Sequence, residues 1–411
     1  MMAPWKSTQS FVSSYDFLPN IRKQFDSKQV VIHDVTLRDG EQEVGVIFRK
    51  DDKVRIARSL DEAGVDRIEA GLPSVSPDDA EAIKEIVNLG LDAKIYAFSR
   101  CMKEDVDRAL SLGVEGLVME VPSSDHLIKY GYGWGQRKTI DLAVEATRYA
   151  HAHGLEVTFF TIDATRAKFD VFWKLVGGVA KEGHMDSLAV ADTFGVMNPE
   201  AMAHLIRRVA RVTKKPVEVH AHNDFGLAVA NSISAVLAGA TVIHTTVNGI
   251  GERSGNTSLE EFVMASRLLY GLQTNVKPEK LRQLSLLVQD LSGVKLPPQK
   301  PVSGSGIFKV ESGIMVGWWR RLNKLNMPLE MFPFLPGLVG QEPITVAIGK
   351  KSGKDSILFL AEENGLRLSE TEVDTILTKV KQVSIAKKAN LTNEEFLSIA
   401  RSQIATRPVA N

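Results

Sequence analysis

The sequence has almost no cysteine, no net charge and no long apolar segment, and each absence excludes a class of protein. The single cysteine, Cys101, excludes an intramolecular disulfide framework and is typical of a reducing compartment. Because 50 basic residues balance 50 acidic ones, the chain lacks the positive excess of nucleic-acid-binding and membrane-surface proteins. No apolar run approaches the roughly 20 residues that span a bilayer, and residues 1–27 lack the apolar core of a signal peptide. We therefore expect a cytoplasmic protein with neither a nucleic-acid nor a membrane partner.

Short β-rich runs alternate with amphipathic helical stretches over about residues 30–271. Eight such runs occur, at 30–37, 67–73, 93–100, 116–124, 156–165, 187–195, 216–224 and 242–252. Strand–helix alternation gives parallel sheets, and eight units predict an α/β fold of the (β/α)8 TIM-barrel type. The competing open, doubly wound sheet is less favoured because no GxGxxG loop follows the first run.

The composition divides the chain into four predicted parts. A polar N-terminal arm (1–29) precedes the barrel (30–275), and a segment rich in Pro and Gly (276–348) is predicted to be a linker or lid. A small helical subdomain (349–411) follows, with capping boxes at Ser369 and Thr392 that predict two helices. The stretch GKKSGK (349–354) lacks the glycine spacing of a phosphate loop and is predicted to be a basic surface turn.

His220 and His222 stand one residue apart in PVEVHAHND (216–224), which is predicted to be the seventh strand. Side chains at i and i+2 of a strand point to the same face, so both imidazoles face one side at the strand's C-terminal end. A hydrogen-bonded pair is the plain interpretation of this spacing, and a divalent metal site is the alternative. In a TIM barrel the C-terminal ends of the strands carry the chemistry.

The first and eighth runs supply the oxygen ligands that such a metal site needs. Asp39 follows the first strand in TLRDG, and Asn256 lies in GERSGN after the eighth. One carboxylate, two imidazoles and an amide oxygen leave positions for a 2-oxo or 2-hydroxy acid that chelates through two oxygens. Arg38, next to Asp39, is suited to stabilising an enolate or a polarised carbonyl oxygen. The mixed ligand set does not distinguish Mg²⁺, Mn²⁺, Zn²⁺ and Co²⁺.

Three motifs, HDVTLRDGEQ (33–42), HAHND (220–224) and NGIGERSGN (248–256), together resemble the DRE-TIM metallolyase superfamily. This superfamily includes 2-isopropylmalate, homocitrate and citramalate synthases and hydroxymethylglutaryl-CoA lyase. The resemblance covers about residues 30–271 and extends more faintly to ESGI (311–314) and GKKSGK (349–354). It implies a divalent metal, an acyl-CoA co-substrate, a 2-oxo acid or hydroxy-diacid as the small-molecule partner, and a homodimer.

The resemblance also implies the residues of the site, all of them near the ends of barrel strands. Arg38 would contact the carbonyl oxygen of the substrate, and Thr193 would bind the carboxylate of the 2-oxo acid. The expected metal ligands are Asp39, His220, His222 and Asn256. The expected substrate-binding residues are Arg38, Gln42, Arg100, Asp192 and Thr193. The expected catalytic residues are Arg38, Glu69, His126 and Asp163.

The chain departs from the synthases at two positions of their acid/base machinery. Ile162-Asp163 stands where the synthases carry Glu-Asp on the fifth strand, and Val310 to Met315 stands where they carry His-Glu-Ser-Gly-Ile-His. His126, in the loop after the fourth strand, is the candidate base in their place, with an exposed loop histidine as the plain alternative.

Three functions are compatible with this pattern. The first is a Claisen-type acyltransferase that condenses an acyl-CoA with a 2-oxo acid to an alkylmalate-like hydroxy-diacid. The second is a carbon–carbon lyase that cleaves a 2-hydroxy acid or diacid. The departures at the two acid/base positions of the synthases favour this second function. The third is a catalytically idle barrel with a binding role. The sequence names neither the substrate pair nor the direction of the reaction.

Overall fold

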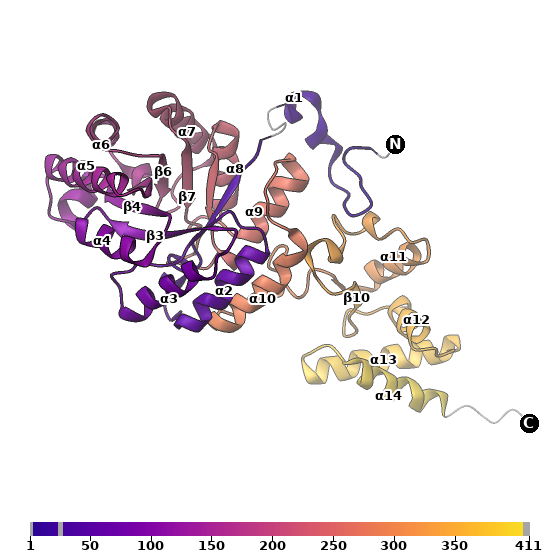
Figure 1. Cartoon of the computed structure of the whole chain (residues 1–411). Helices are drawn as coiled ribbons and strands as arrows, with labels where there is room; N and C mark the ends of the chain where they lie inside the picture. The colour runs from indigo at the N-terminus through magenta and orange to yellow at the C-terminus, as the bar shows by residue number, and fades with distance from the viewer. Residues whose placement is uncertain (1–2, 24–27, 406–411) are drawn as a thin grey trace, which may run out of the picture. The chain divides into compact units, whose positions relative to one another are not determined.

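Eight parallel strands close into a barrel, each hydrogen-bonded to its neighbours in sequence order (Figure 1). The strands are β1 (Val31–Asp34), β2 (Arg67–Glu69), β3 (Lys94–Arg100), β4 (Gly116–Pro122), β5 (Glu156–Ile162), β6 (Ser187–Asp192), β7 (Val217–Ala221) and β8 (Val242–Thr245). Pairing of β1 with β8, with Val31 opposite Val242, closes the ring. Every predicted run contains one of these strands, so the predicted (β/α)8 barrel is confirmed.

The computed structural model describes residues 3–23 and 28–405 and divides into two units. The larger unit, Tyr15–Pro297 with Pro301–Ser303, contains the barrel. The smaller unit comprises Met1–Ser14, Pro298–Lys300 and Gly304–Asn411, as far as these ranges are described. Residues 1–2 and 24–27 of the predicted arm and 406–411 of the predicted tail lie outside the described residues.

Helices surround the barrel strands because each helix buries one apolar stripe (Figure 1). In α7, for example, the buried Met202, Ile206 and Val209 recur at helical spacing. The helix begins after Asn198, whose side chain accepts a hydrogen bond from the Ala201 amide. The helices of the larger unit are α1 (Pro19–Arg22), α2 (Lys50–Glu62), α3 (Pro77–Asn88), α4 (Lys103–Leu112), α5 (Gln136–Ala152), α6 (Phe169–Glu182), α7 (Pro199–Thr213), α8 (Ala228–Ala238), α9 (Leu259–Ala265) and α10 (Leu281–Ser292).

Alternate side chains of each strand fill the barrel interior. A cluster of Tyr96, Phe98, Val118, Phe160, Ala189 and Ala191 packs there. Gly116 on β4 lies against the Tyr96 ring, and a Cβ at this glycine would stand 2.4 Å from a ring carbon. On β4 the residues in step with Gly116 and Val118 therefore face inward, whereas Leu117, Met119 and Val121 are buried against the outer layer.

The smaller unit contains a two-stranded parallel sheet and four helices in its described part. Strands β9 (Lys309–Val310) and β10 (Thr345–Val346) pair, and the helices are α11 (Gly313–Lys324), α12 (Lys354–Glu363), α13 (Glu370–Lys387) and α14 (Asn393–Ile404). Both predicted capping boxes are present, at Ser369 before α13 and at Thr392 before α14.

Residues 276–348, predicted to be a linker or lid and assigned no helix, contain two helices, α10 in the larger unit and α11 in the smaller one. The sequence signal is the weaker for α11. Its 12 residues include Gly313 and Gly317, which weaken the helical signal of the sequence. A Cβ at Gly317 would lie 2.6 Å from Asp355 Oδ2, so the glycine allows α11 to approach α12. The predicted basic turn is present, with Lys350 and Lys351 exposed before α12 begins. Among the described residues, no helix combines the length and the apolar character required to cross a membrane.

Candidate metal centre and active site

Asp39, His220 and His222 converge at the mouth of the barrel. Asp39 follows β1, His220 lies near the end of β7, and His222 follows β7. The three side chains are almost completely buried, and their ligand atoms all lie within 4.8 Å of one another. Asp39 Oδ2 is 3.5 Å from His220 Nε2 and 4.0 Å from His222 Nε2, and the two Nε2 atoms are 3.2 Å apart. The structure thus brings together three of the four predicted metal ligands.

The protonation states of these residues fit a divalent metal ion. Burial lowers the pKa of His220 and of His222 against the opposing effect of the Asp39 charge, so both rings are neutral. His222 Nδ1 lies 3.1 Å from the carbonyl oxygen of Gly255, which places the proton on Nδ1 and the lone pair on Nε2. Burial raises the pKa of Asp39, but the Arg38 charge, together with the hydrogen bond from Asn256, outweighs it and holds the carboxylate ionised.

Asn256, the fourth predicted ligand, lies directly behind the carboxylate. Its Nδ2 donates to Asp39 Oδ1 (2.7 Å) and to the Ile250 carbonyl (3.1 Å). Its Oδ1 is buried and has no hydrogen-bond partner among the described residues. Gly251, at φ +145°, makes room for this amide, because a Cβ there would lie 2.2 Å from Nδ2. An unpaired buried amide oxygen is an available neutral ligand.

Arg38 is held on two sides and unpaired on the third. Its Nε donates to Glu69 Oε1, and its Nη1 donates to Asp39 Oδ2 at 2.6 Å. Its guanidinium carbon stands 4.1 Å over the Phe98 ring. The buried Nη2 has no partner among the described residues. Because an unmade hydrogen bond from a buried charged group is costly, Nη2 is suited to an incoming substrate oxygen.

Glu69, a predicted catalytic residue, is committed to its neighbours. One carboxylate oxygen accepts from Arg38, and the other lies 3.2 Å from His33 Nε2. Burial raises the pKa of Glu69, but Arg38 and His33 outweigh it, so the net pKa is lowered. The carboxylate is therefore ionised and holds the Arg38 guanidinium in place.

His126 and Asp163, also predicted to be catalytic, form a pair. His126 Nε2 lies 2.8 Å from Asp163 Oδ2, and Ser124 Oγ donates to the same oxygen at 2.6 Å. Asp163 is completely buried, whereas the His126 side chain is 41% exposed. Arg166 donates to both carboxylate oxygens, from Nε at 2.7 Å and from Nη2 at 3.1 Å. The arrangement resembles a base oriented by a fixed carboxylate.

The two predicted substrate-binding residues on β6 and after it have different surroundings. Thr193 Oγ1 accepts a hydrogen bond from the Asp163 amide (2.9 Å), and its hydroxyl proton remains available to a ligand. The buried Asp192 accepts from Thr165 Oγ1 (2.7 Å) and from the amides of Val196 (3.1 Å) and Met197 (3.2 Å). Asp192 therefore orders the turn after β6.

The side chains of the remaining two predicted substrate-binding residues, Arg100 and Gln42, make no hydrogen bond or ion pair with the metal ligands among the described residues, although the Gln42 backbone amide donates to the Asp39 carbonyl at 3.0 Å. Arg100, at the end of β3, forms a two-point ion pair with Asp105 at 2.8 and 2.9 Å. Gln42 lies exposed at the end of the short turn Gly40–Gln42 after β1. Both residues lie at or after the C-terminal ends of barrel strands, where Arg100 is paired with Asp105 and Gln42 is exposed.

A buried polar layer inside the barrel was not predicted from the sequence. His33 and His244 stack with ring centroids 4.5 Å apart, and His244 Nε2 lies 2.8 Å from Glu218 Oε2. Glu218 also accepts from Arg67 at 2.9 Å and from Ser187 at 2.6 Å. With its carboxylate already satisfied, this His–Glu–His group is a structural network. The sequence feature that could have predicted this layer is a charged residue within a mostly apolar strand, such as Glu218 in β7. Glu120 in β4 shows the same feature.

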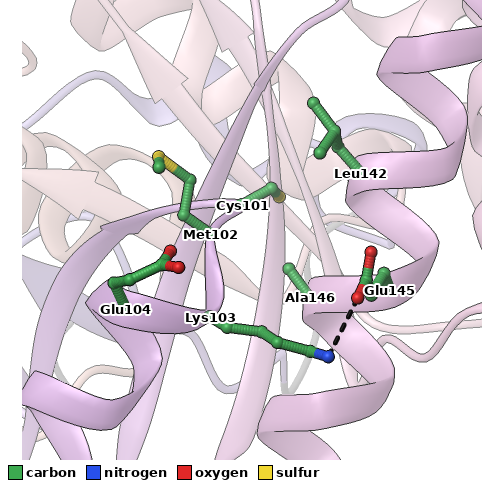
Figure 2. Close-up of a pocket in the computed structure, with 7 residues that line it drawn as sticks. All are labelled: Cys101, Met102, Lys103, Glu104, Leu142, Glu145 and Ala146. Carbon is green, nitrogen blue, oxygen red and sulfur yellow. Dashed lines mark ion pairs between the residues drawn. The ribbon is translucent and has the colours of Figure 1, made fainter.

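A second hollow in the larger unit does not include the metal ligands (Figure 2). It lies between the β3–α4 connection and α5 and is lined by Cys101, Met102, Lys103, Glu104, Leu142, Glu145 and Ala146. Lys103 and Glu145 form an ion pair across it at 2.9 Å. Burial raises the pKa of Cys101, so this thiol is no nucleophile at neutral pH.

Comparison with known proteins finds similarity over most of the chain. The HMGL-like family model matches residues 29–288. A homocitrate synthase of Methanothermobacter thermautotrophicus is 38% identical over 91% of this chain and 94% of its own length. A probable 2-isopropylmalate synthase of Ignicoccus hospitalis is 41% identical over 87% of this chain and 88% of its own length. The crystal structure of the HMG-CoA lyase of Bacillus subtilis matches with a TM-score of 0.58 at 22% identity, over 66% of this chain and 96% of that one.

Proposed function

The chain belongs to the HMGL-like family, and from this premise we propose that it condenses an acyl-CoA with a 2-oxo acid in a divalent-metal-dependent Claisen reaction. The family match confirms the resemblance that the three motifs indicated. Two relatives that align along most of their length are named homocitrate synthase and 2-isopropylmalate synthase, which supports an acyltransferase of the alkylmalate-synthase type. The observation that carries the proposal is the buried Asp39–His220–His222 group beside the unpaired Nη2 of Arg38.

The metal ligands in this proposal are Asp39, His220 and His222, with the Oδ1 of Asn256 available as a fourth. When bound, a divalent metal such as Mg²⁺, Mn²⁺, Zn²⁺ or Co²⁺ supplies Lewis-acid polarisation of the 2-oxo group. Arg38 Nη2 donates to the ketone oxygen, on which negative charge develops as the carbon–carbon bond forms. A donor fixed in advance in this way contributes about 3–4 kcal/mol to transition-state stabilisation.

The carboxylate of the 2-oxo acid would be bound by Thr193. The hydroxyl oxygen of Thr193 already accepts from the Asp163 amide, so its proton points elsewhere and is available to an anionic oxygen. This contact would fix the orientation of the ketone relative to Arg38. Gln42 and Arg100 remain proposed substrate-binding residues at the rim of the mouth.

Proton transfer is assigned to the pair of His126 and Asp163. With the Nε2 proton of His126 directed to Asp163, proton exchange takes place at Nδ1: the imidazolium form gives its Nδ1 proton to the developing alkoxide, and the neutral ring that results accepts a proton from water. Asp163 is the orienting partner, because Ser124 and Arg166 fix its carboxylate. The thioester of the condensation product is then hydrolysed by water, which releases the CoA thiol.

Cleavage of a 2-hydroxy diacid is the second candidate function. The inner residue at the end of β5 is the apolar Ile162, so no carboxylate from this position serves the condensation. The same metal group and Arg38 would stabilise the oxyanion in the reverse direction. Appearance of a 2-oxo acid from hydroxy-diacids without added CoA would identify this direction.

The experiment that tests the proposal is thiol release from acetyl-CoA and longer acyl-CoAs with a panel of 2-oxo acids and Mn²⁺ or Mg²⁺. We expect release with at least one pair, dependent on the metal and absent in Asp39→Asn. Silence across the whole panel in the metal-loaded wild type would contradict the condensation and favour the lyase or a binding role. We further infer that the chain is cytoplasmic, which the single cysteine supports, and that it forms a homodimer, which the family supports. Size-exclusion chromatography with light scattering tests the homodimer.

A further inference from the structure

Glu120 is a carboxylate on the inner face of β4 that none of the roles above uses. It lies in step with Gly116 and Val118, whose inward orientation is set by the Tyr96 ring and the interior cluster. Its strand neighbours are Arg100 on β3 and Phe160 on β5. Because Phe160 also belongs to the interior cluster, Glu120 faces the barrel axis one step above Val118, towards the mouth.

The immediate surroundings of Glu120 are those of the candidate site. Arg38 exerts one of the main electrostatic effects on its carboxylate, and Arg38 stands over the Phe98 ring, which packs edge-on against Phe160. Tyr132 Oη donates to Glu120 Oε1 at a long 3.4 Å. The other charged or titratable groups that act on it are Arg100, Asp105 and Cys101.

Compared with the carboxylates of Asp39, Glu69 and Glu218, Glu120 makes the fewest hydrogen bonds and ion pairs among the described residues. Asp39 belongs to the metal group, Glu69 is bound by Arg38 and His33, and Glu218 is bound by Arg67, Ser187 and His244. Glu120 has only the long bond from Tyr132 and is half-buried. Burial raises its pKa, which is the direction that makes a carboxylate a better base near neutral pH.

We propose that Glu120 is the base that removes the α-proton of the acyl thioester, an inference that rests on the proposed condensation. The Glu120 carboxylate takes the proton, and the electron pair of the broken C–H bond forms the enolate. The enolate carbon bonds to the ketone carbon of the 2-oxo acid, and the carbonyl electron pair moves to the oxygen that Arg38 Nη2 contacts. That oxygen takes the Nδ1 proton of the His126 imidazolium, which becomes the neutral ring, so the two proton transfers use two different groups, both supplied by β4 and the loop after it.

The test compares Glu120→Gln, Glu120→Asp and Glu115→Gln with the wild type in thiol release. Glu120→Gln should lower kcat by about 100-fold or more, with the KM of the 2-oxo acid and the Mn²⁺ affinity changed less than about 3-fold. Glu120→Asp should recover part of the rate. Glu115→Gln is the matched control, because Glu115 precedes β4 at the other end of the strand, and its kcat should stay within about 2-fold of the wild type.

Two further measurements separate base catalysis from a structural role. In D₂O with acetyl-CoA and oxalate as the unreactive partner, the wild type should exchange the methyl protons faster than Glu120→Gln, as read by NMR. Tyr132→Phe removes a hydrogen bond that lowers the pKa of Glu120, so the acidic limb of the kcat profile should move to higher pH. Thermal unfolding of each variant establishes that it is folded.

The outcomes distinguish the two levels of the proposal. A wild type that releases no thiol with any substrate pair overturns the condensation and the role of Glu120 together. A wild type that is active, with a folded Glu120→Gln of equal kcat, overturns the role of Glu120 and leaves the condensation intact.

Discussion

Arg38 Nη1 donates to Asp39 Oδ2 at 2.6 Å, so the residue assigned to the substrate oxygen is tied directly to a residue assigned to the metal. The same guanidinium is fixed through Nε by Glu69. Binding of a metal and binding of a substrate therefore act on one rigid unit. This coupling makes the consequences of several substitutions predictable.

Arg38→Lys is expected to abolish turnover while leaving metal binding largely intact. Lysine keeps the charge but cannot contact Glu69, Asp39 and a substrate oxygen at once, because it lacks the planar fork. We expect kcat to fall by about 10²–10³-fold, as for loss of one oxyanion donor. Steady-state kinetics together with Mn²⁺ titration measure both quantities. A variant that loses metal affinity but keeps its kcat at saturating metal would show that Arg38 serves the metal instead.

His126→Asn and Asp163→Asn are expected to lower kcat by similar factors that do not add. The two residues act as one unit across a 2.8 Å contact, so the double variant should be about as slow as the slower single one. Asparagine suits position 163 because Asp163 has a φ of +58°, a conformation that asparagine tolerates. Additive losses in this double-mutant cycle would mean that the histidine and the carboxylate act independently.

Gly251→Ala is expected to weaken metal binding from outside the metal ligands. A Cβ at this residue would meet Asn256 Nδ2 at 2.2 Å and Asp39 Oδ1 at 3.1 Å, which displaces the amide from the carboxylate. Gly154→Ala is the control, since Gly154 also has a positive φ but its Cβ would meet nothing within 4 Å. Calorimetric Mn²⁺ titration should show a loss for the first variant alone. Equal Mn²⁺ affinity in the two variants would mean that the position of Asn256 has no effect on metal binding.

The free energy of unfolding should depend on pH through Asp34. Burial raises the pKa of Asp34 to about 7 in the folded chain, against an ordinary value near 3.9 in the unfolded chain. Between about pH 4 and pH 7 the folded state binds the proton more tightly, so this contribution to stability falls as the pH rises. Asp34→Asn keeps an acceptor for the Thr36 amide and removes the charge.

Asp34→Asn should therefore gain stability relative to the wild type on going from pH 5 to pH 8. Between pH 5 and the folded pKa of about 7 lie about two pH units, so the gain has an upper limit of roughly 2.7 kcal/mol. Denaturant unfolding of both proteins at the two pH values measures it, and other titrating groups cancel in the comparison. Parallel stability curves for the two proteins would contradict a buried neutral Asp34.

The barrel and the metal group followed from the sequence because both depend on short-range patterns. Two residues on one strand share a face, and strand ends meet at one rim, so His220, His222 and Asp39 were predicted to converge without knowledge of any angle. The pairing of His126 with Asp163 needed the loop after β4 to fold back over β5, which no local pattern encodes. Arg100 pairs with Asp105, which is only five residues further along the chain. This ion pair is local enough to be predicted from the sequence, but it was not predicted.

Glu120 and helix α11 were missed for different physical reasons. Glu120 sits in a strand whose other residues are apolar, and its inward direction follows from β4 register, which depends on how Gly116 meets Tyr96. Helix α11 lies between segments rich in Pro and Gly, and its own glycines are explained only by its packing on α12. In both cases the deciding contact joins residues on different elements.

The central claim is that Asp39, His220 and His222 together hold one divalent cation, and calorimetric titration of the metal-free chain with Mn²⁺ tests it most directly. The predicted result is one ion per chain for the wild type, with binding lost in His220→Gln and in Asp39→Asn while both variants remain folded. Wild-type affinity in either variant, or no binding to the wild type, would contradict the claim.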